Sequence, residues 1–308
     1  MEWWQAAILG LVEGITEYLP VSSTGHLIIA SALMGLDEPG VKSSVDAFNI
    51  VIQGGAILAV LGLYRDRVLQ MLRGLVGKSP AGRRLLINLI VAFLPAAVLG
   101  VLLDDLIERH LFSTGPVLAA LALGGVYMIV LDRWQIRRHR ENPEAETDRL
   151  AAMTARQALV IGFMQCAAMW PGTSRSMMTI TAGVLVGLKP KQAAEFSFLL
   201  GLPTLGGACV YKLAKNLKDS ADAGTPNIFE VFGIGAFAAG LIVATVSAAF
   251  AVKWLVGFLN RHGLEAFGWY RIALAAVLGG LIASGVVTLG GEAAVEIAPD
   301  PTGTVQQP

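Results

Sequence analysis

The segment LVEGITEYLPVSSTGH, residues 11–26, decides the fold because it interrupts an apolar stretch, residues 3–36, near its middle. An unbroken helix over that stretch would be about 50 Å long, too long for a bilayer core of about 30 Å, whereas each half reaches only about 22 Å. The stretch is therefore predicted to form a re-entrant hairpin of two half-helices. Non-helical backbone at membrane depth is tolerated only where it faces protein or a wet cavity, so the break is expected to line one.

The composition around this segment is that of a membrane protein. Of the 308 residues, 55% are hydrophobic and 15% are charged, whereas soluble domains carry about 25% charged residues. Lys and Arg number 23, as do Asp and Glu, so no basic field favours nucleic acid and no acidic excess favours disorder. The stretches long enough to span a bilayer are 46–64, 85–103, 116–131 with an extension to Trp134, 193–211, 229–252 and 270–290.

A second apolar stretch, residues 157–188, has a matching break at PGTS, residues 171–174. A shift of 152 residues aligns the two stretches, and three apolar spans follow each of them. Because three is an odd number, the halves would have opposite topology, as in membrane proteins whose broken helices meet near the bilayer midplane. Chance similarity between apolar segments is the alternative. The aligned pairs are Gly10 and Gly162, Ser22 and Ser174, Ile28 and Ile180, Ala30 and Ala182, Leu33 and Leu185, Gly35 and Gly187, Leu36 and Leu188, with Glu13 opposite Gln165.

The predicted fold is an all-α integral membrane protein. It has six transmembrane helices and two re-entrant helical hairpins, arranged as an inverted-topology repeat within a single membrane domain, residues 1–308. The expected parts of the chain are a first repeat at 3–134, a cytoplasmic linker at 135–156, a second repeat at 157–290 and a disordered external tail at 291–308.

Loop charge predicts the orientation of these helices. The arginine-rich segments 65–84 and 132–156 are expected in the cytoplasm, and the acidic segment 104–115 and the tail after Gly290 are expected outside. Counting spans then places the N-terminus outside, so that the first hairpin enters from the external side and the second from the cytoplasm. Three lysines in 212–226, which this count places outside, conflict with the rule.

Four ionisable residues lie within the two broken stretches. Glu13 and Glu17 are four residues apart, so a helix places both carboxylates on one face. His26 follows the first break, and Arg175 lies at the second. An ionisable side chain at the centre of a membrane helix costs about 2.5–3.5 kcal/mol, so these residues are candidates for function. The alternative is a structural ion pair of glutamate and arginine that holds the hairpins together.

Hydroxyl residues gather at both breaks, where some of them can cap a helix. Two helix N-termini directed at one place, together with hydroxyls and Arg175, form an anion site that suits phosphate. Carboxylates beside a phosphate need a bridging cation, so Glu13 and Glu17 predict bound Mg²⁺ or Ca²⁺. The residues expected around the phosphate are Ser22, Ser23, Thr24, Thr173, Ser174, Arg175 and Ser176.

At these residues the chain resembles a known family. LVEGITEYLPVSSTGH (11–26) and PGTSRSMMT (171–179) are similar to the two signature motifs of the undecaprenyl-diphosphate phosphatases, also called bacitracin-resistance proteins. VIQGGAILAV (51–60) and EFSFLLGLPTLGG (195–207) resemble spans that accompany those motifs. The resemblance implies a multi-pass enzyme of the bacterial plasma (inner) membrane. It would hydrolyse undecaprenyl diphosphate to undecaprenyl phosphate and inorganic phosphate, recycle this lipid carrier for peptidoglycan synthesis, and confer bacitracin resistance.

The resemblance also implies roles for single residues. This chain has Met177 where relatives often have Gly after the Arg-Ser pair. The difference affects how closely the chain can pack at this position, and it does not affect the expected chemistry. The family's acidic pair falls on Glu13 and Glu17, its motif serines on Ser22 and Ser23, its histidine on His26 and its phosphate-binding arginine on Arg175.

Two mechanisms fit these residues. In the first, Ser23 attacks the terminal phosphorus, His26 takes its proton, and Arg175 stabilises the phosphate oxygens. The three-residue spacing of Ser23 and His26 favours this mechanism, because one helical turn brings them together. In the second, a metal-activated water attacks and Ser23 only positions the phosphate.

The alternative is a different class of protein, a secondary transporter or flippase for a lipid phosphate or another anion that uses the same midplane pocket. It would need no nucleophile. In either class the site is expected to face the periplasm or the cell exterior, and whether the chain forms a homodimer is left open.

Overall fold

The structure is a computed structural model that describes residues 1–37, 39–111, 113–141 and 150–287. Within these ranges the chain forms eleven α-helices, with short 3-10 turns at Leu150–Ala152 and Ala167–Met169. The predicted tail and part of the predicted linker lie outside the described residues. The helices are α1 (Trp3–Thr16), α2 (Ser23–Leu33), α3 (Pro39–Leu63), α4 (Arg65–Leu75), α5 (Pro80–Leu111), α6 (Thr114–Glu141), α7 (Ala155–Cys166), α8 (Arg175–Leu185), α9 (Pro190–Ala223), α10 (Ile228–His262) and α11 (Glu265–Ala283).

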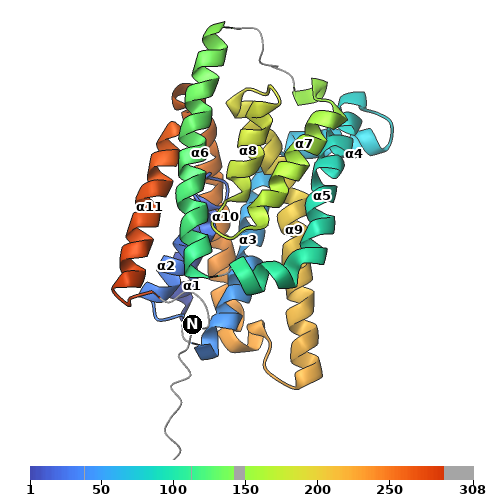
Figure 1. The fold of residues 1–308 in the computed structure, drawn as a ribbon. Helices are drawn as coiled ribbons and strands as arrows, with labels where there is room; N and C mark the ends of the chain where they lie inside the picture. The colour runs from blue at the N-terminus through green and yellow to red at the C-terminus, as the bar shows by residue number, and fades with distance from the viewer. Residues whose placement is uncertain (38, 112, 142–149, 288–308) are drawn as a thin grey trace, which may run out of the picture.

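Among the described residues, six helices are long and apolar enough to cross a membrane, which confirms the predicted number. Figure 1 shows them as a bundle, with α4 and the end of α6 at one end and the α5–α6 and α9–α10 connections at the other. The segments that could span are Ser44–Leu63, Pro80–Leu103, Thr114–Trp134, Pro190–Ala223, Ile228–Leu259 and Glu265–Ala283.

Several helices extend into segments that were expected to be loops. Helix α5 covers most of 104–115, and α9 covers most of 212–226. Charged residues without a helix breaker do not end a helix, whereas Gly224, with a φ of 64°, supplies the left-handed C-terminal cap that ends α9. In α5, charge therefore marks the limit of the apolar span, Pro80–Leu103, and not the end of the helix.

The two predicted breaks are present between α1 and α2 and between α7 and α8. The α1–α2 pair and the α7–α8 pair each contain the same side-chain contact, at positions that are 152 residues apart in the sequence. The Nε2 atom of Gln5 donates to the carbonyl of Met34 over 3.3 Å, and that of Gln157 donates to the carbonyl of Val186 over 2.8 Å. In each pair, the amide ties the start of the first helix to the end of the second.

The aligned glycines occupy equivalent helix crossings. A Cβ atom on Gly10 would collide with the carbonyl oxygen of Gly240 in α10, and one on Gly162 would lie 2.5 Å from the carbonyl oxygen of Ala92 in α5. Both obstacles are backbone, which cannot move aside as a flexible side chain does. Close approach of α1 to α10 and of α7 to α5 therefore requires glycine at both positions.

Helix α8, which carries the second motif, lies in the interior of the bundle. All nine of its residues from Ser176 to Val184 are buried. Met177, the residue that departs from the family pattern, is 1% exposed and belongs to the main hydrophobic core. The turn that follows α1 reaches the same core, where Tyr18 packs edge to face on Phe198 of α9 at a centroid distance of 5.2 Å.

Candidate active site

The two breaks have the same backbone geometry. Ser22 caps α2 with a φ of 75° and accepts a hydrogen bond from the Gly25 amide, and Ser174 caps α8 with a φ of 76° and accepts one from the Met177 amide. Among the described residues, these two serines are the non-glycine residues with positive φ. Such conformations are costly and gather at functional sites. Both helices therefore begin at a serine in a costly conformation whose side chain caps the helix N-terminus.

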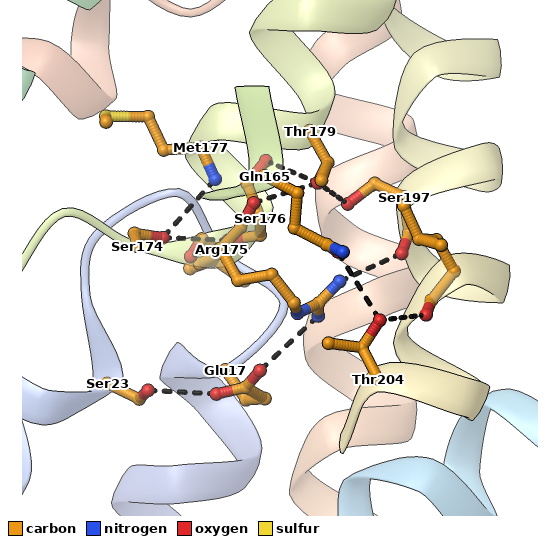
Figure 2. Close-up of polar contacts among 12 residues, drawn as sticks. Glu17, Ser23, Gln165, Ser174, Arg175, Ser176, Met177, Thr179, Ser197 and Thr204 are labelled. Atoms are coloured by element: carbon orange, nitrogen blue, oxygen red, sulfur yellow. Dashed lines mark hydrogen bonds and ion pairs between the residues drawn. The ribbon is translucent and has the colours of Figure 1, made fainter. Parts of the chain in front are cut away.

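Glu17 connects the two hairpins. The Oγ atom of Ser23 donates to Glu17 Oε2 over 2.9 Å, and Nη2 of Arg175 donates to Glu17 Oε1 over 3.3 Å, as Figure 2 shows. The Arg175 and Glu17 side chains are 9% and 6% exposed. The glutamate–arginine pair considered from the sequence is thus present, and it also places a hydroxyl, a carboxylate and a guanidinium in one chain of contacts.

Arg175 is held from three sides. Its Nη1 donates to the carbonyl of Ser197 over 2.9 Å, and its guanidinium lies 5.5 Å from the ring centroid of Tyr18. Its Nε is buried and has no hydrogen-bond partner among the described residues. A buried donor without a partner costs free energy, so this N–H remains available to an anion.

The other hydroxyls of the second motif have mixed surroundings. Ser176 donates to the carbonyl of Leu19 over 2.8 Å and therefore joins the hairpins, and its Oγ lies 3.0 Å from that of Ser174 (Figure 2). For Thr24 and Thr173, the described part of the chain provides no side-chain hydrogen bond, and both are half-buried. These two hydroxyls are thus free to meet a ligand.

Glu13 is completely buried, and neither of its carboxylate oxygens has a hydrogen-bond partner among the described residues. Its polar surroundings include the side chains of Glu17 and Gln53. Two neighbouring carboxylates match the oxygen ligands that Mg²⁺ and Ca²⁺ prefer. Within the described residues, no group of three or more His, Cys, Asp or Glu could hold a metal. A cation here would therefore rely on these two carboxylates, neutral oxygens and a ligand phosphate.

His26 has two partners, and Ser23 is neither of them. Its Nδ1 lies 2.7 Å from the carbonyl oxygen of Ser22, and its Nε2 lies 2.7 Å from the hydroxyl of Tyr270. Among the described residues, no hydrogen bond joins Ser23 to His26; the Ser23 hydroxyl instead contacts Glu17. Sequence spacing predicted that His26 would accept the proton of Ser23, but the partner of His26 Nε2 is the Tyr270 hydroxyl.

The family model described as "Bacitracin resistance protein BacA" matches residues 6–277 of this sequence. The chain belongs to the BacA family. Proteins named undecaprenyl-diphosphatase are similar to it: one from Sorangium cellulosum is 46% identical over 278 residues, covering 90% of this chain and 86% of the relative. One from Polaromonas sp. is 41% identical over 92% and 96% of the two chains, and one from Pseudomonas paraeruginosa is 44% identical over 90% and 94%.

The BacA match includes every candidate residue and at least part of each of the six apolar helices of the described chain, so the chain is a multi-pass membrane protein of this bacterial family. Sequence reasoning missed one charged residue of this BacA chain, Arg271, which is completely buried in α11. Its Nη2 donates to the carbonyls of Ala120 and Gly172, over 3.0 and 2.8 Å. A single arginine inside a predicted apolar span was the available signal. Nothing in the sequence distinguished its neighbour Tyr270.

Proposed function

We propose that this chain hydrolyses undecaprenyl diphosphate to undecaprenyl phosphate and inorganic phosphate, the activity that its BacA relatives' name describes. The observation that carries this proposal is the contact chain Ser23–Glu17–Arg175, which joins both family motifs (Figure 2). A nucleophile, a proton acceptor beside it and a cation for the phosphate oxygens are the groups that such a reaction needs. Phosphate release by the purified protein in detergent tests the proposal.

Ser23 is the proposed nucleophile, because its hydroxyl already donates to Glu17. Its Oγ attacks the terminal phosphorus as its proton passes to Glu17 Oε2, and the bond from that phosphorus to the bridging oxygen breaks. Undecaprenyl phosphate leaves with the bridging oxygen, and Ser23 carries the phosphoryl group. Water then attacks this phosphorus, and the bond from phosphorus to Ser23 Oγ breaks. The hydroxyl of the water leaves as part of inorganic phosphate, and the other proton of the water restores the Ser23 hydroxyl. Glu17 releases the proton it took and completes the cycle.

Arg175 and the N-termini of α2 and α8 are the proposed phosphate ligands. Each N-terminus carries about half a positive charge, and its amides suit phosphate oxygens. Thr24, Thr173 and Ser174 are the neighbouring hydroxyls proposed to contact the phosphate. A divalent cation held by Glu13 and Glu17 would supply charge neutralisation for the diphosphate. A lipid-phosphate transporter would use the same phosphate ligands, but it would not need the hydrogen bond from the Ser23 hydroxyl to the Glu17 carboxylate.

Glu13→Gln should raise the Mg²⁺ or Ca²⁺ concentration needed for half-maximal phosphate release at least about tenfold, which is about 1.4 kcal/mol. The amide keeps the shape of the carboxylate and removes its charge. A titration of the purified variant with each cation measures the shift. Glu230→Gln is the control, because Glu230 is exposed in the capping box of α10, where glutamine serves equally well. An unchanged cation requirement in folded Glu13→Gln protein would contradict a metal role for this carboxylate.

The re-entrant hairpins and the inverted repeat of residues 3–134 and 157–290, joined by the linker 135–156, are part of the same proposal. The shared capping geometry, the paired glutamine contacts and the paired glycine crossings support it. In Figure 1 the α1–α2 pair lies toward the lower end of the bundle and the α7–α8 pair toward the upper end, as entry from opposite sides of a membrane would require.

The site should face the periplasm or cell exterior, because the loop charges place the end of the bundle that holds the α1–α2 pair outside. A Thr24→Cys variant, made without Cys166 and Cys209, should react in intact cells with a maleimide that cannot cross membranes. The same chain without the new cysteine is the control. Labelling that appears only after the cytoplasmic face is opened would contradict this orientation.

A further inference from the structure

His26 lies between a carbonyl and a phenol. Its Nδ1 is 2.7 Å from the Ser22 carbonyl oxygen. A carbonyl only accepts hydrogen bonds, so Nδ1 carries a hydrogen and the neutral ring has its lone pair at Nε2. The hydroxyl of Tyr270 lies 2.7 Å from that Nε2, and the two rings are parallel within 6°, with centroids 5.6 Å apart. The hydrogen-bonding capacity of His26 is therefore fully used by these two groups.

We infer that Tyr270 is a positioning residue for the hydrolysis, and that it acts by holding Nε2 of His26 in a fixed orientation on α2, three residues after the proposed nucleophile Ser23. The contact crosses 244 residues of sequence, from α2 to α11. The Tyr270 hydroxyl can donate to neutral His26 or accept from protonated His26, so it supports the ring in both states. The inference rests on the proposed phosphatase function for its kinetic consequence.

Helix α11 is well placed to hold His26, because it is anchored on both sides of Tyr270. The next residue, Arg271, donates to the carbonyls of Ala120 and Gly172, and Gly172 belongs to the second family motif. At the start of the helix, Glu265 pairs with Arg133 of α6 at 2.7 Å. Adjacent residues of α11 thus contact the first hairpin through His26 and the second through Gly172.

The competing explanation is that Tyr270, which is 48% exposed, is a surface tyrosine with an incidental hydrogen bond. Its neighbour Trp269 provides a matched control. Trp269 is also exposed, donates to Glu265 over 3.3 Å and does not contact His26. The two substitutions Tyr270→Phe and Trp269→Phe each remove one donor from the same turn of α11 and keep an aromatic ring.

The kinetic test is a double-mutant cycle of Tyr270→Phe with His26→Ala, scored by phosphate release. Tyr270→Phe alone should lower kcat about tenfold with KM changed less than about twofold, because the loosened His26 ring shares the first turn of α2 with Ser23; this is less than deleting a general acid or base costs. In the His26→Ala background it should have no further effect, because it acts through that ring. Trp269→Phe should stay within about twofold of the wild type. Wild-type kcat in Tyr270→Phe, or effects that add in the double variant, would overturn the inference.

A second readout is independent of turnover. Diethyl pyrocarbonate modifies unprotonated imidazole nitrogens, and the Tyr270 hydroxyl covers Nε2 of His26. Peptide mass mapping should show His26 modified at least about three times faster in Tyr270→Phe, and at the wild-type rate in Trp269→Phe. An unchanged rate in Tyr270→Phe would overturn the inference even if kcat fell. Should the wild-type protein release no phosphate, the proposed function fails, and the modification rate still decides whether Tyr270 holds His26.

Discussion

Ser23→Ala should lower phosphate release by more than about 1,000-fold, because it removes the oxygen that attacks phosphorus. The Glu17–Arg175 contact does not involve this hydroxyl, so the variant should fold and still bind the lipid diphosphate. Initial rates of phosphate release at saturating lipid diphosphate measure the loss. Ser22→Ala is the matched control, because it removes a helix cap and should cost about 1 kcal/mol, mostly in stability.

The opposite result would identify a different nucleophile. Folded Ser23→Ala protein that retains more than a few per cent of wild-type turnover would favour a metal-activated water, with the Ser23 hydroxyl only positioning the phosphate. Glu17 or His26 would then serve as the base toward that water.

Arg175→Lys should lower kcat/KM about 30- to 1,000-fold, a loss of about 2–4 kcal/mol in transition-state stabilisation. The guanidinium uses one terminal nitrogen for Glu17 and the other for Ser197, and keeps Nε for an anion. A lysine ammonium is a single point charge on a flexible stem and cannot hold all three positions. Steady-state kinetics of the two proteins measure the loss.

A second arginine–glutamate pair supplies the control for this substitution. Nε of Arg67 lies 2.7 Å from Glu195, but the Arg67 side chain is 38% exposed and remote in sequence from both motifs. A partly exposed pair contributes about 0–1 kcal/mol, so Arg67→Lys should change kcat/KM little. Near wild-type turnover in Arg175→Lys would support a purely structural ion pair between Arg175 and Glu17.

The membrane helices and the two breaks were predictable because their causes are local. Apolar length sets the spans, and the PVSSTG and PGTS clusters stop the helices within about one turn. The strained serine caps follow from the same clusters. The ends of α5 and α9 were missed, since helices continue beyond the bilayer until a residue such as Gly224 stops them.

The partners within the site were less predictable, because they depend on packing between distant helices. Helical spacing brings Ser23 and His26 into the same turn, yet each side chain contacts a group outside that turn. The positive φ of Ser22 sets the direction of the chain entering α2, and α11 supplies Tyr270 from the far end of the sequence. The spacing of residues along α2 predicts neither the backbone direction at Ser22 nor the approach of Tyr270 from α11.

The most direct test uses undecaprenyl diphosphate labelled in its terminal phosphate, incubated with purified wild-type protein and Mg²⁺ or Ca²⁺ in detergent, where transport across a membrane cannot occur. The Ser23–Glu17–Arg175 arrangement predicts labelled inorganic phosphate and unlabelled undecaprenyl phosphate in equal amounts, with neither formed by Ser23→Ala protein. Label that stays entirely in the lipid, while the same protein moves the intact diphosphate across vesicle membranes, would contradict hydrolysis and establish a transporter.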